Sequence, residues 1–234
     1  MTLPVYEHGT PAAVWPVIHL AGRDLAFRNA DLAAQFGATG VFVISMVGDD
    51  DAIDPVAVDI KLRHPQMKVG VNYLTLPAHV ALARSLSLGM DATWTDRCGV
   101  RSDSVDERVP ELSRMLSGNP THDFFGSVAF KYQRPDADPP TAAKRAIEFG
   151  MIPTTSGEAT GHAPPAEKLR RIREAIGNGP LALASGVAPE NARELGAYLT
   201  HILVATGISR MTDTFDETLL RRLMKLVREP VSGA

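Results

Sequence analysis

Two short segments near the C-terminal end of the sequence combine glycine with hydroxyl side chains, a pattern typical of anion-binding loops. Ser185 and Gly186 stand in the first segment, and Thr206 and Gly207 stand in the second. Because glycine has no Cβ, the backbone N–H groups beside it can approach an anion closely. These four residues are predicted to bind phosphate, and Arg210 could add a charge-assisted contact. The alternative is that the glycines only form tight turns.

A third segment, 155–162, alternates hydroxyl side chains with glycines just before a pair of prolines that is expected to open a helix. Proline suits the first turn of a helix because the N–H that it lacks would be unpaired there. The N-terminus of such a helix attracts anions through its unpaired N–H groups and its dipole. Ser156 and Gly157 are therefore added to the predicted phosphate-binding residues.

Three polar residues at the ends of apolar runs could carry out chemistry on a bound ligand. They are Asn72, Asp96 and Lys131. Opposite charges in a cleft tune each other's proton affinity, so Asp96 and Lys131 could act as a general acid–base pair, with Asn72 at the reacting end. A structural salt bridge over the same place, or two solvated side chains, would give the same pattern. The sequence leaves these alternatives open.

Other reactive side chains are predicted to be structural. His19 stands inside an apolar run and is expected to be a satisfied core histidine. The aspartates at 49–51 could hold Mg²⁺, but adjacent carboxylates on a flexible loop rarely converge, so a solvated loop is expected. Arg97 could lower the pKa of Cys98, but an inert thiol is the more common case for a lone cysteine.

The cysteine and histidine content argues against a disulfide or a metal centre. The chain has one cysteine, and its seven histidines are scattered without the spacing of a zinc motif. We therefore expect no metal and no cofactor, and a reducing cytoplasm fits the cysteine usage.

Charge and hydropathy exclude several classes of partner. The 234 residues are 44% hydrophobic and 22% charged, and the formal net charge is -3. This balance gives no reason to expect nucleic acid or an anionic membrane as a partner. No apolar run approaches the roughly 20 residues of a membrane span. The N-terminal text also lacks the basic start and apolar centre of a signal peptide.

Short apolar runs alternate with amphipathic segments along the chain. The expected strands are 14–20, 38–45, 68–74, 90–96, 124–131, 150–155, 180–184 and 201–205. The expected helices are 24–36, 54–63, 77–88, 106–116, 141–149, 164–176, 189–199 and 214–227. Strict alternation with near-continuous apolar strands predicts parallel strands that are buried on both faces.

Eight such units predict an α/β fold, a single (β/α)8 TIM barrel over residues 1–234. The main alternative, an open Rossmann-like sheet, is disfavoured because no G-x-G-x-x-G follows any strand. In a barrel, functional residues lie in the loops after the strands, and phosphate commonly binds between the loops after strands seven and eight. The two glycine-and-hydroxyl segments fall in those two loops.

The sequence also resembles a known family, the BtpA-like barrels of the ribulose-phosphate-binding class. The resemblance is carried by VIHL (17–20), GVNYL (70–74), GMDATWTD (89–96), TSGEATGHAPPAEKLRRIREA (155–175) and ASGVAPENARELGAYLTHILVATGIS (184–209). It implies a (β/α)8 fold and, by analogy with related barrels, phosphate held by the stretches that contain Ser185, Gly186, Thr206 and Gly207. The chain departs from the family's pattern after its first two strands, where it reads AGRDLAFRNA and SMVGDDD.

Two functions from different classes remain. The first is an enzyme of the isomerase, lyase or phosphoribosyl-transfer type that acts on a phosphorylated sugar or nucleotide-like small molecule. The second is a non-catalytic binding or assembly protein, because the BtpA-like family takes its name from a role in photosystem I biogenesis. Polar residues at the strand ends favour the first, and the altered early loops favour the second. A homodimer is expected from the apolar residues Leu86, Leu88 and Met115 on predicted surface helices.

Overall fold

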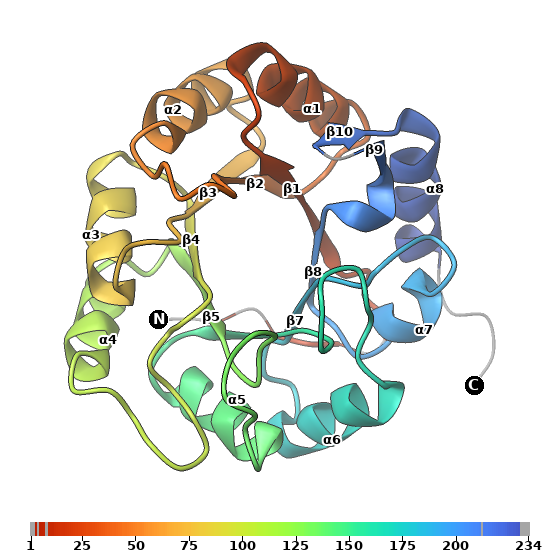
Figure 1. The fold of residues 1–234 in the computed structure, drawn as a ribbon. Coiled ribbons are helices and arrows are strands. Elements are labelled where there is room, and N and C mark those ends of the chain that lie inside the picture. Colours follow the sequence, from red (N-terminus) through yellow and green to blue (C-terminus); the bar gives the residue numbers. More distant parts are fainter. Residues whose placement is uncertain (1–2, 4, 8, 212, 230–234) are drawn as a thin grey trace.

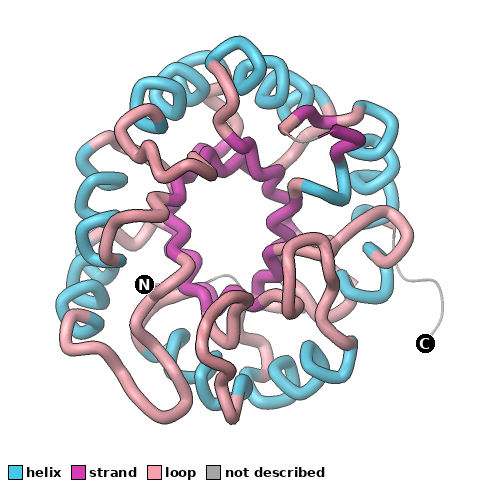
Figure 2. Tube along the Cα trace, viewed as in Figure 1, coloured by secondary structure: helices cyan, strands magenta, loops and turns pink. Residues whose placement is uncertain are grey.

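Eight parallel strands form a closed barrel in the computed structural model, which describes residues 3, 5–7, 9–211 and 213–229 (Figures 1 and 2). The strands follow one another around the barrel in sequence order, and β1 closes the ring by pairing with β8. Helices surround the ring on its outside. The predicted (β/α)8 fold is confirmed. Residues 1–2 and 230–234, which the single-domain prediction includes, lie outside the described residues.

The elements agree with the alternation expected from the sequence. The barrel strands are β1 (Ala13–His19), β2 (Gly40–Ile44), β3 (Lys68–Asn72), β4 (Ala92–Thr95), β5 (Asp123–Ser127), β6 (Ile152–Thr155), β7 (Ala182–Ala184) and β8 (His201–Val204). The helices are α1 (Arg23–Gln35), α2 (Ile53–Arg63), α3 (Ala78–Ser87), α4 (Val109–Gly118), α5 (Pro139–Glu148), α6 (Ala166–Ile176), α7 (Ala192–Gly196) and α8 (Glu217–Arg228). None of the helices in the described ranges is long and apolar enough to cross a membrane.

The interior of the barrel is filled by aromatic side chains. The rings of Trp15, Phe42, Trp94 and Phe125 pack against one another with centroids 5.0 to 5.8 Å apart. Gly70 makes room for this cluster, because a Cβ there would lie 2.4 Å from the Phe42 ring. Since the interior is a packed core, ligand chemistry is confined to the barrel mouth, where the strands end.

The opposite face of each strand packs under the helices. Val69 and Val71 of β3 are fully buried, as are Ala57 and Ile60 of α2. This alternation places residues of one parity inside the barrel and residues of the other parity in the outer apolar layer. The long apolar runs of the sequence reflect burial on both faces.

Two boundaries differ from the prediction for local reasons. β5 ends at Ser127 and does not reach Lys131, because Ala129 has a φ of 47° that a strand cannot use. α7 is much shorter than the expected 189–199. The side chain of Asn191 accepts from the N–H of Ala188 and donates to the loop before it, which holds that loop in a non-helical turn.

The C-terminal segment differs most from the prediction. The last helix begins at Glu217, where Asp216 caps it by accepting from the N–H of Leu219 at 2.9 Å. A short 3₁₀ turn, η1 (Thr206–Ile208), follows β8. An antiparallel hairpin of β9 (Ser209–Met211) and β10 (Thr214–Phe215) separates that turn from α8 (Figure 1). The remaining helix boundaries lie within about three residues of those predicted.

Candidate functional site

The nine predicted site residues all lie at the carboxyl end of the barrel. Asn72 ends β3, Asp96 follows β4, Lys131 lies in the loop after β5, Ser156 and Gly157 follow β6, Ser185 and Gly186 follow β7, and Thr206 and Gly207 lie in η1 after β8. Because the strands are parallel, these positions share one mouth. The sequence-based placement on that face agrees with the structure.

The loops after β7 and β8 carry four backbone N–H groups that donate to no acceptor among the described residues. They belong to Gly186, Val187, Thr206 and Gly207. Gly186 and Val187 are buried, where an unpaired donor costs roughly 1–3 kcal/mol. Successive free N–H groups in a turn form a concavity that suits an anion.

These two loops touch each other at Gly207. A Cβ on Gly207 would lie 1.9 Å from the carbonyl oxygen of Val187, so only glycine permits the contact. β7 and β8 are paired up to Ala184 and Leu203, so their loops leave the sheet side by side. The unpaired N–H groups therefore belong to adjoining loops, where barrels commonly bind phosphate.

The loop after β6 folds over the loop after β7. A Cβ on Gly186 would lie 2.3 Å from the backbone N of Ala163. The N–H of Gly161 donates to the Oγ of Ser185 at 2.9 Å, and Ser185 has a positive φ of 95°. Gly186 is thus required for packing between loops. This packing does not conflict with an anion site, because the N–H of Gly186 has no acceptor in the described chain.

Ser156 and Gly157 lie buried at the base of this folded loop. The Oγ of Ser156 accepts from the N–H of Lys131 and donates to the carbonyl oxygen of Gly157, both at 2.8 Å. A Cβ on Gly157 would lie 2.1 Å from the carbonyl oxygen of His162. Ser156 is hydrogen-bonded and Gly157 is closely packed within the chain, so both residues support the loop that covers Gly186.

Arg210 does not turn toward the predicted phosphate site. Its guanidinium pairs with Asp216 at 2.6 Å, and its side chain is 68% exposed. The expectation of an inward contact is wrong in this structure, because the β9–β10 hairpin brings Arg210 beside the acidic N-cap of α8.

Asn72 and Asp96 are joined on the opposite part of the mouth. The Nδ2 of Asn72 donates to the carboxylate of Asp96 at 3.2 Å. Asn72 is fully buried, and its Oδ1 has no partner among the described residues. Burial raises the pKa of Asp96, against the Asn72 hydrogen bond and the charges of Lys131 and Arg97. Asp96 therefore holds a proton more readily than a surface aspartate does.

Lys131 is near Asp96 without pairing with it. Its Nζ donates to the Oγ1 of Thr160 at 3.2 Å and lies 5.5 Å from the ring centre of Phe130. Burial lowers the pKa of Lys131, against the charges of Asp96 and Tyr132. In the described chain no ion pair joins Lys131 to Asp96, so a structural salt bridge does not explain their placement.

Lys168 was missed by the sequence analysis. Its Nζ reaches in from α6 and donates to the carbonyl oxygens of Ala129 and Ser156, both at 2.8 Å. Burial lowers the pKa of Lys168 to about 8. Together with Lys131 it lines a cavity of about 460 Å³ between the loops after β5 and β6. In the sequence, Lys168 is one of several cations on the polar face of a helix, and nothing distinguishes it there.

The acidic run after β2 is only partly solvated. Asp50 is 6% exposed, and its carboxylate accepts from the N–H groups of Leu74 and Thr75 and from the Thr75 hydroxyl. The expectation of a solvated loop is wrong for Asp50, which ties two loops together, whereas the Asp51 side chain is 90% exposed. Among the described residues, no three His, Cys, Asp or Glu side chains form a group that could hold a metal ion.

Cys98 and His19 complete the reactive side chains singled out in the sequence. Burial raises the pKa of Cys98 to about 11, and its thiol donates to the carbonyl oxygen of Ser127, so the thiol is held in its unreactive form. His19 is not a core histidine as expected, because its side chain is 20% exposed and bonds to the carboxylate of Asp213.

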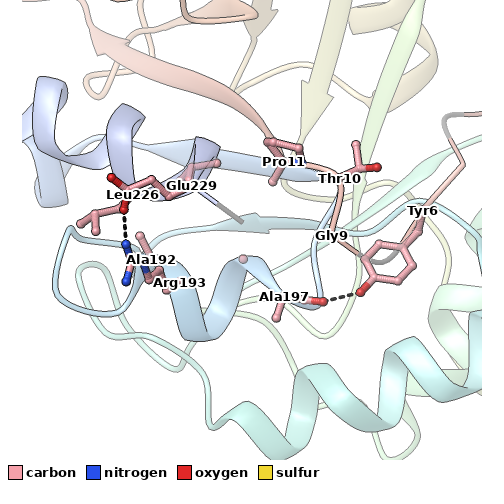
Figure 3. Close-up of a pocket in the computed structure, with 12 residues that line it drawn as sticks. Tyr6, Gly9, Thr10, Pro11, Ala192, Arg193, Ala197, Leu226 and Glu229 are labelled. Atoms are coloured by element: carbon pink, nitrogen blue, oxygen red, sulfur yellow. Dashed lines mark hydrogen bonds and ion pairs between the residues drawn. The ribbon is translucent and has the colours of Figure 1, made fainter. Parts of the chain in front are cut away.

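A small cavity lies at the other end of the barrel, away from these residues (Figure 3). It has a volume of about 40 Å³ and lies between α7, the end of α8 and the segment before β1. The hydroxyl of Tyr6 donates to the carbonyl oxygen of Ala197, and Arg193 forms an ion pair with Glu229. A space of this size holds a few water molecules, so it is too small for a sugar phosphate.

Several solved structures share this architecture over almost their whole length. Phosphoribosyl anthranilate isomerase from Thermus thermophilus has a TM-score of 0.65 and 17% identity, covering 92% of this chain and 97% of that one. (S)-3-O-geranylgeranylglyceryl phosphate synthase from Thermoplasma acidophilum, in complex with sn-glycerol-1-phosphate, has a TM-score of 0.66 and 17% identity, covering 93% and 94%. A KDPGal structure has a TM-score of 0.67 and 14% identity, covering 95% and 97%.

The chain has the fold of these barrels. Identities this low show the fold alone, so the activities of those proteins are not transferred by the comparison. No family model matches the chain, and no curated protein matches its sequence. The BtpA-like resemblance therefore stays a prediction.

Proposed function

We propose that this protein is an enzyme that acts on a phosphorylated small molecule, with the phosphate bound between the loops after β7 and β8. The observation that carries the proposal is the set of unpaired N–H groups at Gly186, Val187, Thr206 and Gly207. A phosphate accepts several hydrogen bonds at once, and it offsets the cost of leaving these donors unpaired. Of two proteins of similar fold, one is named for a phosphoribosyl compound and the other was solved with sn-glycerol-1-phosphate. Both are consistent with this class of ligand.

Asn72, Asp96 and Lys131 would face the reacting end of the ligand. They lie after β3, β4 and β5, across the mouth from the phosphate loops. Burial raises the pKa of Asp96 and lowers the pKa of Lys131, so the two values move toward the range in which proton transfer is efficient. The Nδ2 of Asn72 donates to Asp96 and holds its carboxylate in place at the mouth.

This arrangement favours proton abstraction and isomerisation. A phosphate that takes no part in the reaction supplies binding energy that orients the other end of the molecule. Lyase and phosphoribosyl-transfer reactions are also compatible with an anchored phosphate, which orients the reacting end in the same way. The substrate class is a phosphorylated sugar or a nucleotide-like small molecule.

A second candidate is a non-catalytic binding or assembly protein of the BtpA-like kind. It is favoured by contacts that already engage the acid–base residues, namely Asn72 with Asp96 and Thr160 with Lys131. Under this alternative the phosphate site is kept, and the side chains at the far side of the mouth are structural.

Calorimetry with matched ligands tests the proposal. A panel of sugar phosphates and the same sugars without phosphate is titrated into the protein, and we expect binding of phosphorylated members only. Asp96→Asn and Lys131→Met should keep the affinity within about threefold and lower turnover by about 10²–10⁴-fold. Lys144→Met, on the exposed side of α5, is the control.

The outcomes separate the candidates. Equal binding of sugars and sugar phosphates would contradict the phosphate site. Binding of a sugar phosphate without turnover by the unmodified protein would favour the binding or assembly alternative. Unchanged turnover in both variants would remove Asp96 and Lys131 from the reaction.

A further inference from the structure

His19 stands at the mouth of the barrel with its side chain on the inner face. It is the last residue of β1 and has the same parity as Trp15 and Val17, which pack inside the barrel. In the sheet register, His19 pairs with Ile44 of β2, and Ile44 pairs with Asn72 of β3. Since neighbouring strands lie about 4.8 Å apart, the backbones of His19 and Asn72 are separated by about 10 Å, the span of a small ligand.

The imidazole of His19 bonds to a carboxylate that comes from a distant part of the chain. Its Nδ1 lies 3.1 Å from the Oδ1 of Asp213, which stands between β9 and β10. Asp213 has a φ of 69°, in the left-handed region that aspartate adopts more readily than most residues. The hairpin that the sequence did not predict is the element that brings this carboxylate to His19.

A buried asparagine holds the hairpin in place. The Nδ2 of Asn29 donates to the carbonyl oxygen of Asp213 at 2.7 Å, and its Oδ1 accepts from the N–H of Phe215 at 3.1 Å. Asn29 lies on α1 and is 3% exposed. Because the amide nitrogen and the amide oxygen of Asn29 each form a hydrogen bond with the hairpin backbone, this buried side chain fixes the position of Asp213.

His19 differs from the buried His122 in having a free ring nitrogen. Both ring nitrogens of His122 are occupied, one by Thr93 and one by the carbonyl oxygen of Met90. The Nε2 of His19 has no hydrogen-bond partner in the described part of the chain, and the residue lines a cavity of about 180 Å³. Since most buried side-chain polar atoms have a hydrogen-bond partner, a free Nε2 beside a cavity is available to a ligand.

The cavity beside His19 adjoins the proposed phosphate site. Thr206, whose N–H is unpaired, is among its lining residues, and so is Ser209 of β9. β1 pairs with β8, with Pro16 opposite Val204, so the end of β1 and the loop after β8 are neighbours. Around the mouth, the order is the phosphate loops, then His19, then Asn72 and Asp96.

We propose that His19 is an acid–base residue of this site, held by Asp213, and that it exchanges a proton with an atom of the ligand close to the anchored phosphate. This inference rests on the proposed function. With Nδ1–H donated to Asp213, the lone pair of Nε2 is directed away from the carboxylate and can accept a proton from a ligand hydroxyl or carbon. The Asp213 carboxylate stabilises the imidazolium, which returns the proton to the ligand or to water.

The tautomer of His19 tests the geometry without any ligand. Two-bond ¹H–¹⁵N correlation spectra at alkaline pH should show Nδ1–H and an unprotonated Nε2 for His19. Asp213→Asn keeps an oxygen acceptor and should keep this tautomer, whereas Asp213→Ala should shift His19 toward Nε2–H. A Nε2–H tautomer in the unmodified protein would overturn the proposal, because the lone pair would then face the carboxylate.

Acylation by diethyl pyrocarbonate, with mapping by mass spectrometry, tests the exposure of Nε2 to the ligand. His19 should be acylated, and saturating inorganic phosphate should slow its acylation at least fivefold, while partly exposed His79 on α3 should react equally with and without phosphate. Calorimetry with inorganic phosphate on the same samples shows whether a negative result concerns His19 alone or the phosphate site as well. Phosphate binding without protection of His19, or an unreactive His19, would overturn only this inference. Absence of phosphate binding would overturn the proposed function and this inference together.

Discussion

Gly207 has room for a hydrogen atom and nothing larger, because the carbonyl oxygen of Val187 occupies the place of a Cβ. Gly186 is constrained in the same way by the backbone of Ala163. The sequence indicated these glycines through their neighbours Ser185 and Thr206, but it could not indicate their contacts, which join loops far apart in the chain. Val187 was not predicted, because its contribution is a backbone N–H and leaves no signature in a side chain.

A negative charge introduced at Thr206 tests whether the phosphate binds beside this residue. Thr206 is exposed, so both Thr206→Glu and Thr206→Gln should fold normally. A carboxylate about 5 Å from the phosphate would repel it by about 3 kcal/mol per unit charge at an effective dielectric constant near 20. Calorimetry should therefore show inorganic phosphate affinity at least tenfold weaker in Thr206→Glu and within about threefold of the unmodified protein in Thr206→Gln. Equal affinities in the two variants would place the phosphate elsewhere.

Lys168 connects three elements at the mouth. Its Nζ, carried by α6, donates to Ala129 in the loop after β5 and to Ser156 in the loop after β6. The periodicity of α6 predicted the helix well, since Leu169 and Ile172 are fully buried. The same periodicity assigned Lys168 to the solvent side, because a long side chain can return to a buried acceptor in a way that helical spacing does not show.

The pH dependence of stability should report this buried amine. Burial lowers the pKa of Lys168 from the usual 10.5 to about 8, so between these pH values the unfolded chain holds a proton that the folded chain lacks. The stability of the unmodified protein should therefore rise with pH in this window, relative to Lys168→Met, by up to about 3 kcal/mol. Denaturant unfolding at pH 8 and at pH 10.5 measures the difference.

The exposed lysine of α5 provides the matched control for that measurement. Lys144→Met removes one lysine without removing a contact to the loops after β5 and β6. A stability difference that changes equally with pH in the Lys144 and Lys168 variants would show that Lys168 titrates as a surface group, which would contradict its buried position.

Elements were predictable where local pattern and tertiary environment agree. The apolar runs predicted all eight barrel strands, and β6 accommodates Pro153 within the sheet, opposite Gly126. β5 was predicted too long because 128–130 is apolar like a strand although it packs as a loop. The β9–β10 hairpin was not predicted: β10 was assigned to the start of the last helix and β9 to the segment before it, since both strands are too short to show an alternation.

For the whole molecule, the alternation of eight strands with eight helices sufficed to predict a closed barrel and the face that carries the site. Residues at strand ends were predictable for this reason, as with Asn72 and Asp96. Residues brought to the mouth by other elements were not, as with Lys168 from α6 and Asp213 from the hairpin. Their positions depend on tertiary contacts that no local pattern records.

Self-association is expected at the scale of the whole molecule, although the three residues first proposed for it are partly buried. Leu86, Leu88 and Met115 pack against the outer core. Met46 and Val47, after β2, are instead 58% and 88% exposed and would supply apolar surface for a homodimer. Light scattering should give about twice the chain mass of 25.2 kDa. A monomer mass at high protein concentration would contradict this expectation.

Phosphate is proposed to bind to the backbone where the loops after β7 and β8 meet. This proposal is tested most directly by titrating inorganic phosphate into ¹⁵N-labelled protein and following every backbone amide by NMR. We expect the amides of Gly186, Val187, Thr206 and Gly207, which have no acceptor in the described chain, to shift most and to follow one binding curve. Phosphate binding with the largest shifts at any other segment, or saturating phosphate without shifts at these four amides, would contradict it.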